Sequence, residues 1–258
     1  MTTGQDGRGA IAAAFLMVRS RRPLAPSADR SWWNGTAGIV PTDGLVTMPQ
    51  PSRRPVIVTE RFDAAYLFAS DLHRDQCRKG AGSPYIAHLL QVAGLVLEAG
   101  ADEDTAIAAL LHDAVEDQGG AATRDAIAAR FGERVARVVD GCSDSAGSPK
   151  PPWPARKQAH IDRIPAESPE VRLVVTADKL HNTRSITADY RRLGEELWPI
   201  FHGRRDGTLL SIHGMTDALT RADPDAPLLA DLRAAVAELD RLTGYLDGTN
   251  RAGETATA

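Results

Sequence analysis

The chain has 258 residues, of which 43% are hydrophobic, 5% aromatic and 25% charged, and its formal net charge is −4. This length fits one large domain or one domain with appendages, and the hydrophobic share suffices for a packed core. Basic and acidic residues are mixed along the chain, so the sequence indicates no basic segment that would bind nucleic acid or an anionic membrane. The two cysteines, Cys77 and Cys142, form no CxxC pair, so neither a disulfide framework nor a zinc finger is indicated and a cytoplasmic protein is expected.

The first segment, residues 1–55, is rich in Gly, Ser, Arg, Pro and Ala and keeps no hydrophobic period. This composition predicts a disordered leader, and Met48 is then a candidate for the biological start. The longest early apolar run, residues 11–18, is much shorter than the roughly 20 residues that span a bilayer. We therefore expect no membrane segment.

Helical periodicity dominates the rest of the chain and predicts an all-α domain over residues 56–246, followed by a disordered polar tail over 247–258. Ser, Thr or acidic residues precede several of these segments, and glycines follow them, as helix ends require. Residues 147–154 (GSPKPPWP) are predicted to form a rigid loop. The expected helices cover residues 59–73, 83–100, 102–120, 123–131, 133–142, 168–186 and 223–246.

One of these helices carries an unusual group of ionisable residues in the stretch IAALLHDAVEDQ, residues 107–118. Successive helical residues are turned by about 100°, so the apolar residues share one broad side. His112, Asp113 and Glu116 then fall within an arc beside that side, with Asp117 at its margin. An ordinary solvated face would include Lys or Arg to balance these acids, and this helix contains none.

Two further helices each place an ionisable residue within an apolar stripe. His88 shares its face with Tyr85 and Val92, and Asp178 shares its face with Val174 and Asn182. Taken singly, each has a plainer interpretation: a core histidine with one partner, an aspartate paired with Lys or Arg, and a solvated acidic face. Because an unpaired buried carboxylate is very costly, a histidine and carboxylate set on three helices instead indicates a site for a divalent metal.

Four sequence words in this order resemble the HD-domain metal-dependent phosphohydrolases. Within that family they are most similar to the (p)ppGpp hydrolase branch, which includes the hydrolase domain of the Rel/SpoT enzymes and the small alarmone hydrolases. The resemblance covers roughly residues 62–192. The words are RKGAGSPYIAH (78–88), AALLHDAVED (108–117), FGERVARVVDG (131–141) and ADKLHNTR (177–184).

The resemblance implies an HD-domain helical bundle that binds one divalent ion of the Mn²⁺ type. It implies that Glu116 and Asp117 activate the attacking water, with Glu116 as general base. The implied metal ligands are His88, His112, Asp113 and Asp178. The implied substrate-binding residues are Arg78, Lys79, Tyr85, Asn182, Arg184, Arg156 and Lys157.

The activity implied by the resemblance is removal of the 3′-pyrophosphate of ppGpp, which yields GDP or GTP and pyrophosphate. The chain departs from the family pattern at Leu89, where proline is usual, at Gln118, where threonine is usual, and at VVTAD (174–178) in place of VKLAD. These departures leave open an HD hydrolase of a dNTP, a nucleoside monophosphate or NADPH, and a non-catalytic nucleotide-binding protein. The expected partner is a nucleotide, without nucleic acid or membrane, and a homodimer is left open.

Overall fold

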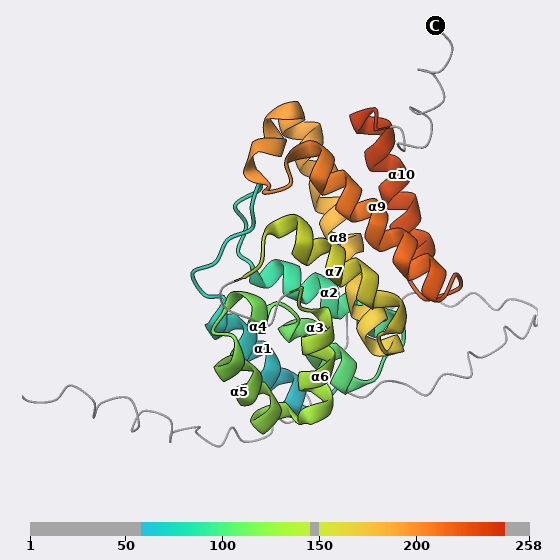
Figure 1. Cartoon of the computed structure of the whole chain (residues 1–258). Coiled ribbons are helices and arrows are strands. Elements are labelled where there is room, and N and C mark those ends of the chain that lie inside the picture. The colour runs from blue at the N-terminus through green and yellow to red at the C-terminus, as the bar shows by residue number, and fades with distance from the viewer. Residues whose placement is uncertain (1–57, 145–149, 246–258) are drawn as a thin grey trace, which may run out of the picture. The chain divides into compact units, whose positions relative to one another are not determined.

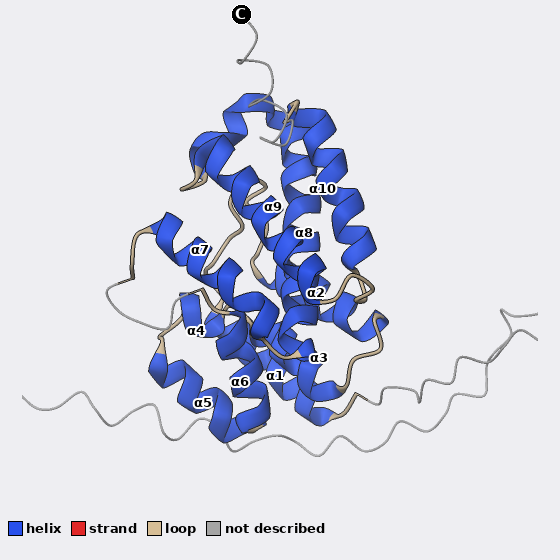
Figure 2. Ribbon diagram, turned by 45° about the vertical axis from the view of Figure 1, so that its right-hand side comes forward, coloured by secondary structure: helices blue, strands red, loops and turns tan. Residues whose placement is uncertain are grey.

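The structure is a computed structural model that describes residues 58–144 and 150–245. The predicted leader, Met48, the predicted tail and the first part of the predicted loop at 147–154 lie outside the described residues. Within the described part every regular secondary-structure element is a helix, so the predicted all-α class is confirmed (Figures 1 and 2). None of the described helices is both long enough and apolar enough to cross a membrane.

The α-helices follow one another with short connections, and two 3-10 segments join them. The 3-10 segments are η1 (Ile164–Ala166) and η2 (Gly194–Ile200). The α-helices are α1 (Glu60–Leu72), α2 (Ile86–Glu98), α3 (Glu103–Leu111), α4 (Ala114–Asp117), α5 (Ala121–Phe131), α6 (Glu133–Cys142), α7 (Trp153–Arg163), α8 (Pro169–Leu193), α9 (Arg204–Ala222) and α10 (Leu229–Thr243).

Local chemistry fixes several of the helix starts. The side chain of Thr59 accepts a hydrogen bond from the backbone N–H of Arg61, and Ser168 caps α8 in the same way, with Pro169 at the first helical position. These caps satisfy backbone donors that have no partner inside the helix. The predicted boundary at Gly132 is confirmed, because its positive φ of 96° separates α5 from α6.

The single helix predicted over residues 102–120 is wrong, because the structure breaks it after Leu111. Asp113 takes φ −96° and ψ −5°, outside the helical minimum, and α4 restarts with Asp117 N–H donating to the Asp113 carbonyl at 2.9 Å. This sparsely populated backbone region often holds active-site residues. The turn changes the direction of His112 and Asp113 relative to a continuous helix, which periodicity alone does not reveal.

Helix α8 is the longest described helix, and α2, α3, α6, α9 and α10 all pack against it. Helix α3 lies deep in the core, with every side chain from Thr105 to Leu111 buried. Helices α7 and α9 pack against each other. They meet where the Trp153 ring rests on Gly203, at which an added Cβ would lie 2.5 Å from the indole. A side chain at Gly203 would therefore push α7 away from α9.

Candidate active site

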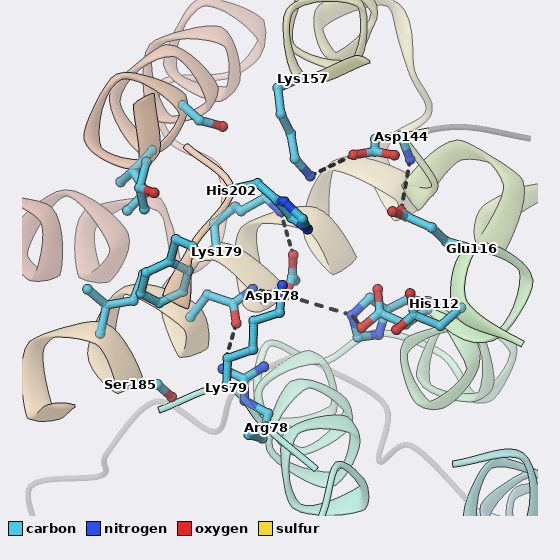
Figure 3. A pocket seen from close by; sticks show the side chains of 18 of the residues that line it. Arg78, Lys79, His112, Glu116, Asp144, Lys157, Asp178, Lys179, Ser185 and His202 are labelled. Atoms are coloured by element: carbon cyan, nitrogen blue, oxygen red, sulfur yellow. Dashed lines mark hydrogen bonds and ion pairs between the residues drawn. The ribbon is translucent and has the colours of Figure 1, made fainter. Parts of the chain in front are cut away.

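Three separate segments bring two histidines and two aspartates to one point. His88 comes from α2, His112 and Asp113 from the turn after α3, and Asp178 from α8. His88 Nε2 lies 3.3 Å from Asp178 Oδ1 and 3.5 Å from Asp113 Oδ2. His112 Nε2 lies 3.0 Å from Asp113 Oδ2 and 3.7 Å from Asp178 Oδ1. The four predicted metal ligands therefore converge; Figure 3 labels two of them, His112 and Asp178.

The histidine rings present the nitrogens that a metal ion needs. His112 Nδ1 donates to the Ala109 carbonyl at 2.8 Å, which leaves the Nε2 lone pair directed at the carboxylates. Although it is buried, His112 Nε2 has no hydrogen-bond partner among the described residues. His88 Nδ1 lies 2.8 Å from His181 Nδ1, so its Nε2 also faces the cluster. A lone pair facing a carboxylate oxygen is repulsive unless a proton or metal ion lies between them.

The charges of the cluster also favour a cation. Burial opposes ionisation of Asp113 and Asp178, but the neighbouring histidines and, for Asp178, Lys179 hold both pKa values well below the usual 3.8. Burial lowers the pKa of His112, yet the two carboxylates outweigh it and raise that pKa well above 6.5. Both carboxylates thus stay charged in the interior. Ligand atoms of His88, His112 and Asp178 all lie within 4.8 Å of one another, so the donor set fits a divalent ion.

Neighbouring polar groups fix the carboxylates in place. Lys179 Nζ binds Asp178 Oδ2 at 2.7 Å, and Asn182 Nδ2 donates to Asp178 Oδ1 at 2.5 Å. Tyr85 O–H donates to Asp113 Oδ2 at 2.6 Å, and burial and the Asp113 charge raise the pKa of Tyr85 so that it remains a donor. Such outer partners orient metal ligands.

The predicted acidic pair lies beside the cluster on α4. The Glu116 carboxylate is 20% exposed, and burial together with the Asp144 charge raises its pKa above the usual 4.5. Asp117 Oδ2 accepts a hydrogen bond from Gln76 Nε2 at 2.8 Å, and Gln118 Nε2 donates to Gln76 Oε1 at 2.8 Å. Gln118, which departs from the family pattern, thus positions Gln76, and Gln76 in turn holds Asp117.

A cavity of about 430 Å³ opens beside this cluster. Residues of α4, α7, α8 and the segment before α9 line it, together with the loop before α2. A second cavity of about 200 Å³ lies against the same loop and includes His88 and His181. The predicted residues that line the larger cavity are Arg78, Lys79, Tyr85, His112, Asp113, Glu116, Asp117, Lys157, Asp178 and Asn182.

The basic residues of the loop before α2 face the cavity from below in Figure 3. The loop closes through a hydrogen bond from Arg78 N–H to the Ser83 carbonyl at 2.8 Å. Arg78 donates to Asn182 Oδ1 at 2.8 Å, and its guanidinium carbon lies 5.9 Å from the Tyr85 ring centre. Arg78 is therefore held at the cavity wall by α8 and Tyr85.

Two predicted substrate-binding residues do not line either cavity. Arg156 pairs with Asp144 and lies 3.4 Å from Glu116 Oε1. Arg184 is 53% exposed and lies 3.9 Å from Asp231 of α10. Lys157 does line the larger cavity, although its Nζ is paired with Asp144 Oδ2 at 2.6 Å. The structure thus separates Arg184 from the other predicted site residues.

The structure adds residues that the sequence analysis did not single out. Lys179 and His181 lie inside the word ADKLHNTR, so their closeness to Asp178 in the sequence could have identified them as candidate site residues. Asp144, Lys150 and His202 lie outside all four words. Lys150 Nζ donates to the Glu116 carbonyl at 2.9 Å, and the turn before α9 brings His202 to the cavity. Only long-range packing reveals these three.

Comparison with known proteins gives matches over the part of the chain that contains these site residues. The HD domain family matches residues 65–209. The guanosine-3′,5′-bis(diphosphate) 3′-pyrophosphohydrolase of Aquifex aeolicus is 39% identical over 127 residues, which are 49% of this chain but 18% of that protein. The human guanosine-3′,5′-bis(diphosphate) 3′-pyrophosphohydrolase MESH1 is 40% identical over 134 residues, which are 51% of this chain and 70% of MESH1.

Several of these relatives are much longer than their matched region. The chain spans less than a fifth of the Aquifex aeolicus protein and 19% of a probable enzyme of the same name from Synechocystis. Among solved structures, that of a metazoan ortholog of SpoT that hydrolyses ppGpp has a TM-score of 0.60 at 26% identity. The likeness covers 74% of this chain and 99% of that one.

Proposed function

The chain belongs to the HD-domain family, and on this premise we propose that it is a metal-dependent phosphohydrolase that removes the 3′-pyrophosphate of guanosine tetra- and pentaphosphate. The observation that carries this proposal is a buried cluster of imidazoles and carboxylates that opens on a cavity lined by Arg78 and Lys79. The similarity to proteins named as 3′-pyrophosphohydrolases supports the choice of substrate.

His88, His112, Asp113 and Asp178 would hold the metal ion, which we propose to be Mn²⁺. Two neutral imidazoles and two carboxylates suit a borderline divalent ion of the first transition row. When bound, such an ion supplies Lewis-acid polarisation of a phosphoryl oxygen and lowers the pKa of a water. The hydrogen bond from His112 Nδ1 to Ala109 fixes the tautomer that binds metal through Nε2.

Glu116 acts in this proposal as the general base that takes a proton from the attacking water. Its raised pKa brings it closer to neutrality, where a base is most effective. Water attacks the phosphorus next to the ribose 3′-oxygen, and the bond between that phosphorus and the 3′-oxygen breaks. Asp117, held by Gln76, either orients that water or acts as the acid that protonates the leaving 3′-oxygen, and pyrophosphate and GDP or GTP are released.

The basic residues bind the polyanionic substrate on the other side of the cavity. Arg78 presents a planar guanidinium that pairs with phosphate through two hydrogen bonds or stacks on a base. Lys79 is exposed beside it, and Lys157 lies across the cavity on α7. Bound between these cations, the pyrophosphate would face the carboxylate and imidazole cluster.

The test is metal analysis of the purified protein combined with turnover of a nucleotide panel in the presence of added Mn²⁺. We expect one divalent ion per chain and release of pyrophosphate from ppGpp, with much slower release of phosphate from dNTPs, nucleoside monophosphates or NADPH. Faster turnover of another nucleotide would keep the HD hydrolase and reject the substrate. Tight binding of ppGpp without any product would instead identify a nucleotide-binding protein.

A further inference from the structure

Asp144 is an ionisable residue in the interior that none of the proposed catalytic steps uses. It follows the end of α6, and its side chain is only 1% exposed. Two consecutive residues of α7 neutralise it: Arg156 binds Oδ1, and Lys157 Nζ binds Oδ2 at 2.6 Å. A buried carboxylate must be paired to be tolerated, and this one takes two consecutive basic residues of α7.

The same aspartate also contacts Glu116, the proposed base. The backbone N–H of Asp144 donates to Glu116 Oε2 at 3.3 Å, as Figure 3 shows. Arg156 Nη1 lies 3.4 Å from Glu116 Oε1, and Lys150 Nζ lies 3.6 Å from the same oxygen. Glu116 therefore shares one cation, Arg156, with a second carboxylate that is more deeply buried.

The balance of charge decides which carboxylate the cations neutralise. Arg156 makes its closer contact with Asp144 and its longer contact with Glu116. Lys157 contacts Asp144, and no ion pair joins it to Glu116 within the described residues. Without the charge of Asp144, Arg156 and Lys157 would have Glu116 as their remaining nearby anion, so the existing Arg156 contact would tighten and Lys157 would gain one.

We propose that Asp144 is a positioning residue that draws Arg156 and Lys157 toward itself, so that Glu116 keeps only the longer contact with Arg156 and none with Lys157 and stays incompletely neutralised beside the cavity. This inference rests on the proposed function only for its catalytic consequence, because the placement of charge stands independently of any substrate. Burial and the Asp144 charge together raise the pKa of Glu116, in agreement with a base that is not fully neutralised by its neighbours.

A stability cycle tests the placement of charge without any substrate. It compares Glu116→Gln, Asp144→Asn and the double variant with the wild type by thermal unfolding. In the wild type we expect Glu116→Gln to leave Tm unchanged or slightly higher, since relief of the repulsion with Asp144 offsets the loss of the longer contacts with Arg156 and Lys150 at 3.4 and 3.6 Å. In the Asp144→Asn background the same change should lower Tm by about 2–4 °C, because it breaks the tightened salt bridge between Arg156 and Glu116. Equal Tm changes in both backgrounds would overturn the proposal.

Kinetics on ppGpp test the catalytic consequence. Asp144→Asn should lower kcat about tenfold without raising KM, since a salt-bridged Glu116 is a weaker base. Asp144→Asn combined with Arg156→Gln should recover most of kcat, whereas a mere loss of contact between α6 and α7 would worsen in the double variant. A raised KM with unchanged kcat, or no recovery, would reject the role of Asp144.

A matched control is available on α6, four residues before Asp144. Asp140 pairs with Arg124 at 3.0 Å and is more exposed than Asp144, so Asp140→Asn removes a similar charge that is not paired with Arg156 or Lys157. We expect wild-type kcat for this control. If the wild type itself fails to hydrolyse ppGpp while the stability cycle shows the expected reversal, then the proposed hydrolysis is wrong and the charge arrangement around Asp144 stands.

Discussion

Two regions of the molecule pair a histidine with an aspartate, and they differ in almost every other respect. His213 of α9 binds Asp240 of α10 at 2.9 Å, with side chains that are 21% and 23% exposed. His112 lies 3.0 Å from Asp113 and is 3% exposed, and it also faces Asp178 from a third segment. The distances are nearly equal, so pair geometry alone does not distinguish a metal site from an ordinary contact between helices.

The difference lies in what surrounds each pair. His213 Nε2 donates to a single carboxylate, that of Asp240. The His213 ring packs near the Tyr245 ring, with ring centres 5.2 Å apart. His112 Nδ1 donates to the Ala109 carbonyl, so Nε2 is the nitrogen that faces the carboxylates of Asp113 and Asp178. A proton or a metal ion must lie between this nitrogen and the two carboxylates, whereas His213 meets a single carboxylate.

The largest difference between the two regions is expected when one histidine is removed from each of them. His112→Ala should abolish metal binding and lower kcat/KM on ppGpp by about a thousandfold or more, because the ion loses a ligand. His213→Ala should retain one metal ion per chain and near wild-type turnover. Metal content and turnover of both variants provide the check, and a metal-replete His112→Ala protein would contradict the ligand assignment.

The next largest effect is expected at Glu116, the carboxylate beside the proposed metal ligands. Glu116→Gln should lower kcat by about 10² to 10⁴, the usual range for a general base, while metal content and Tm stay near wild type. Glu238 of α10, which pairs with Arg191, offers a matched control, and Glu238→Gln should remain active. Full activity of Glu116→Gln would remove this residue from the mechanism.

The lysine that holds Asp178 should have an intermediate effect. Lys179→Met removes the partner of Asp178 Oδ2, so metal affinity should fall by about 10- to 100-fold, as for other groups that orient a ligand. Titration calorimetry of the metal-free protein measures this affinity directly. The comparable change in the other region, Arg191→Met, breaks only the exposed pair with Glu238 and should leave metal affinity unchanged.

A dependence on pH sharpens the same contrast. In the metal-free protein the raised pKa of His112 adds stability below about pH 6.5, and this stability is lost as pH rises through the raised folded-state pKa. Metal must displace that proton, so the rise of Tm caused by added Mn²⁺ should be larger at pH 8.5 than at pH 6.5. An equal rise at both pH values would mean that His112 binds no proton in the metal-free site.

The smallest effect is expected at Arg184, which the structure places with α10 rather than with the cavity. Arg184→Ala should change KM for ppGpp less than about twofold, because its exposed contact with Asp231 contributes little. Arg78→Ala should raise KM about tenfold or more, since it removes a charge-assisted contact with phosphate. Similar KM values for the two variants would mean that Arg184 reaches the substrate after all.

Two of the four proposed metal ligands could be expected in the interior from the sequence, because each of them interrupts an apolar helical stripe. His88 and Asp178 lie on faces whose other residues are hydrophobic, and a buried ionisable residue needs a partner wherever the fold places it. The helical class and most helix ends followed from periodicity, caps and glycines, which act over a few residues. These features depend on local chemistry, so the sequence reports them directly.

The break after Leu111 and the direction of the basic residues depended on the tertiary structure. Nothing local in the word AALLHDAVED ends the helix; the turn exists because His112 and Asp113 meet residues of α2 and α8. Likewise Arg156 is turned to Asp144 and Arg184 to α10, although both lie near predicted site residues. The sequence determined which side chains face the interior, whereas long-range packing decided which of them meet, because periodicity specifies a buried face but not the helix against which it packs.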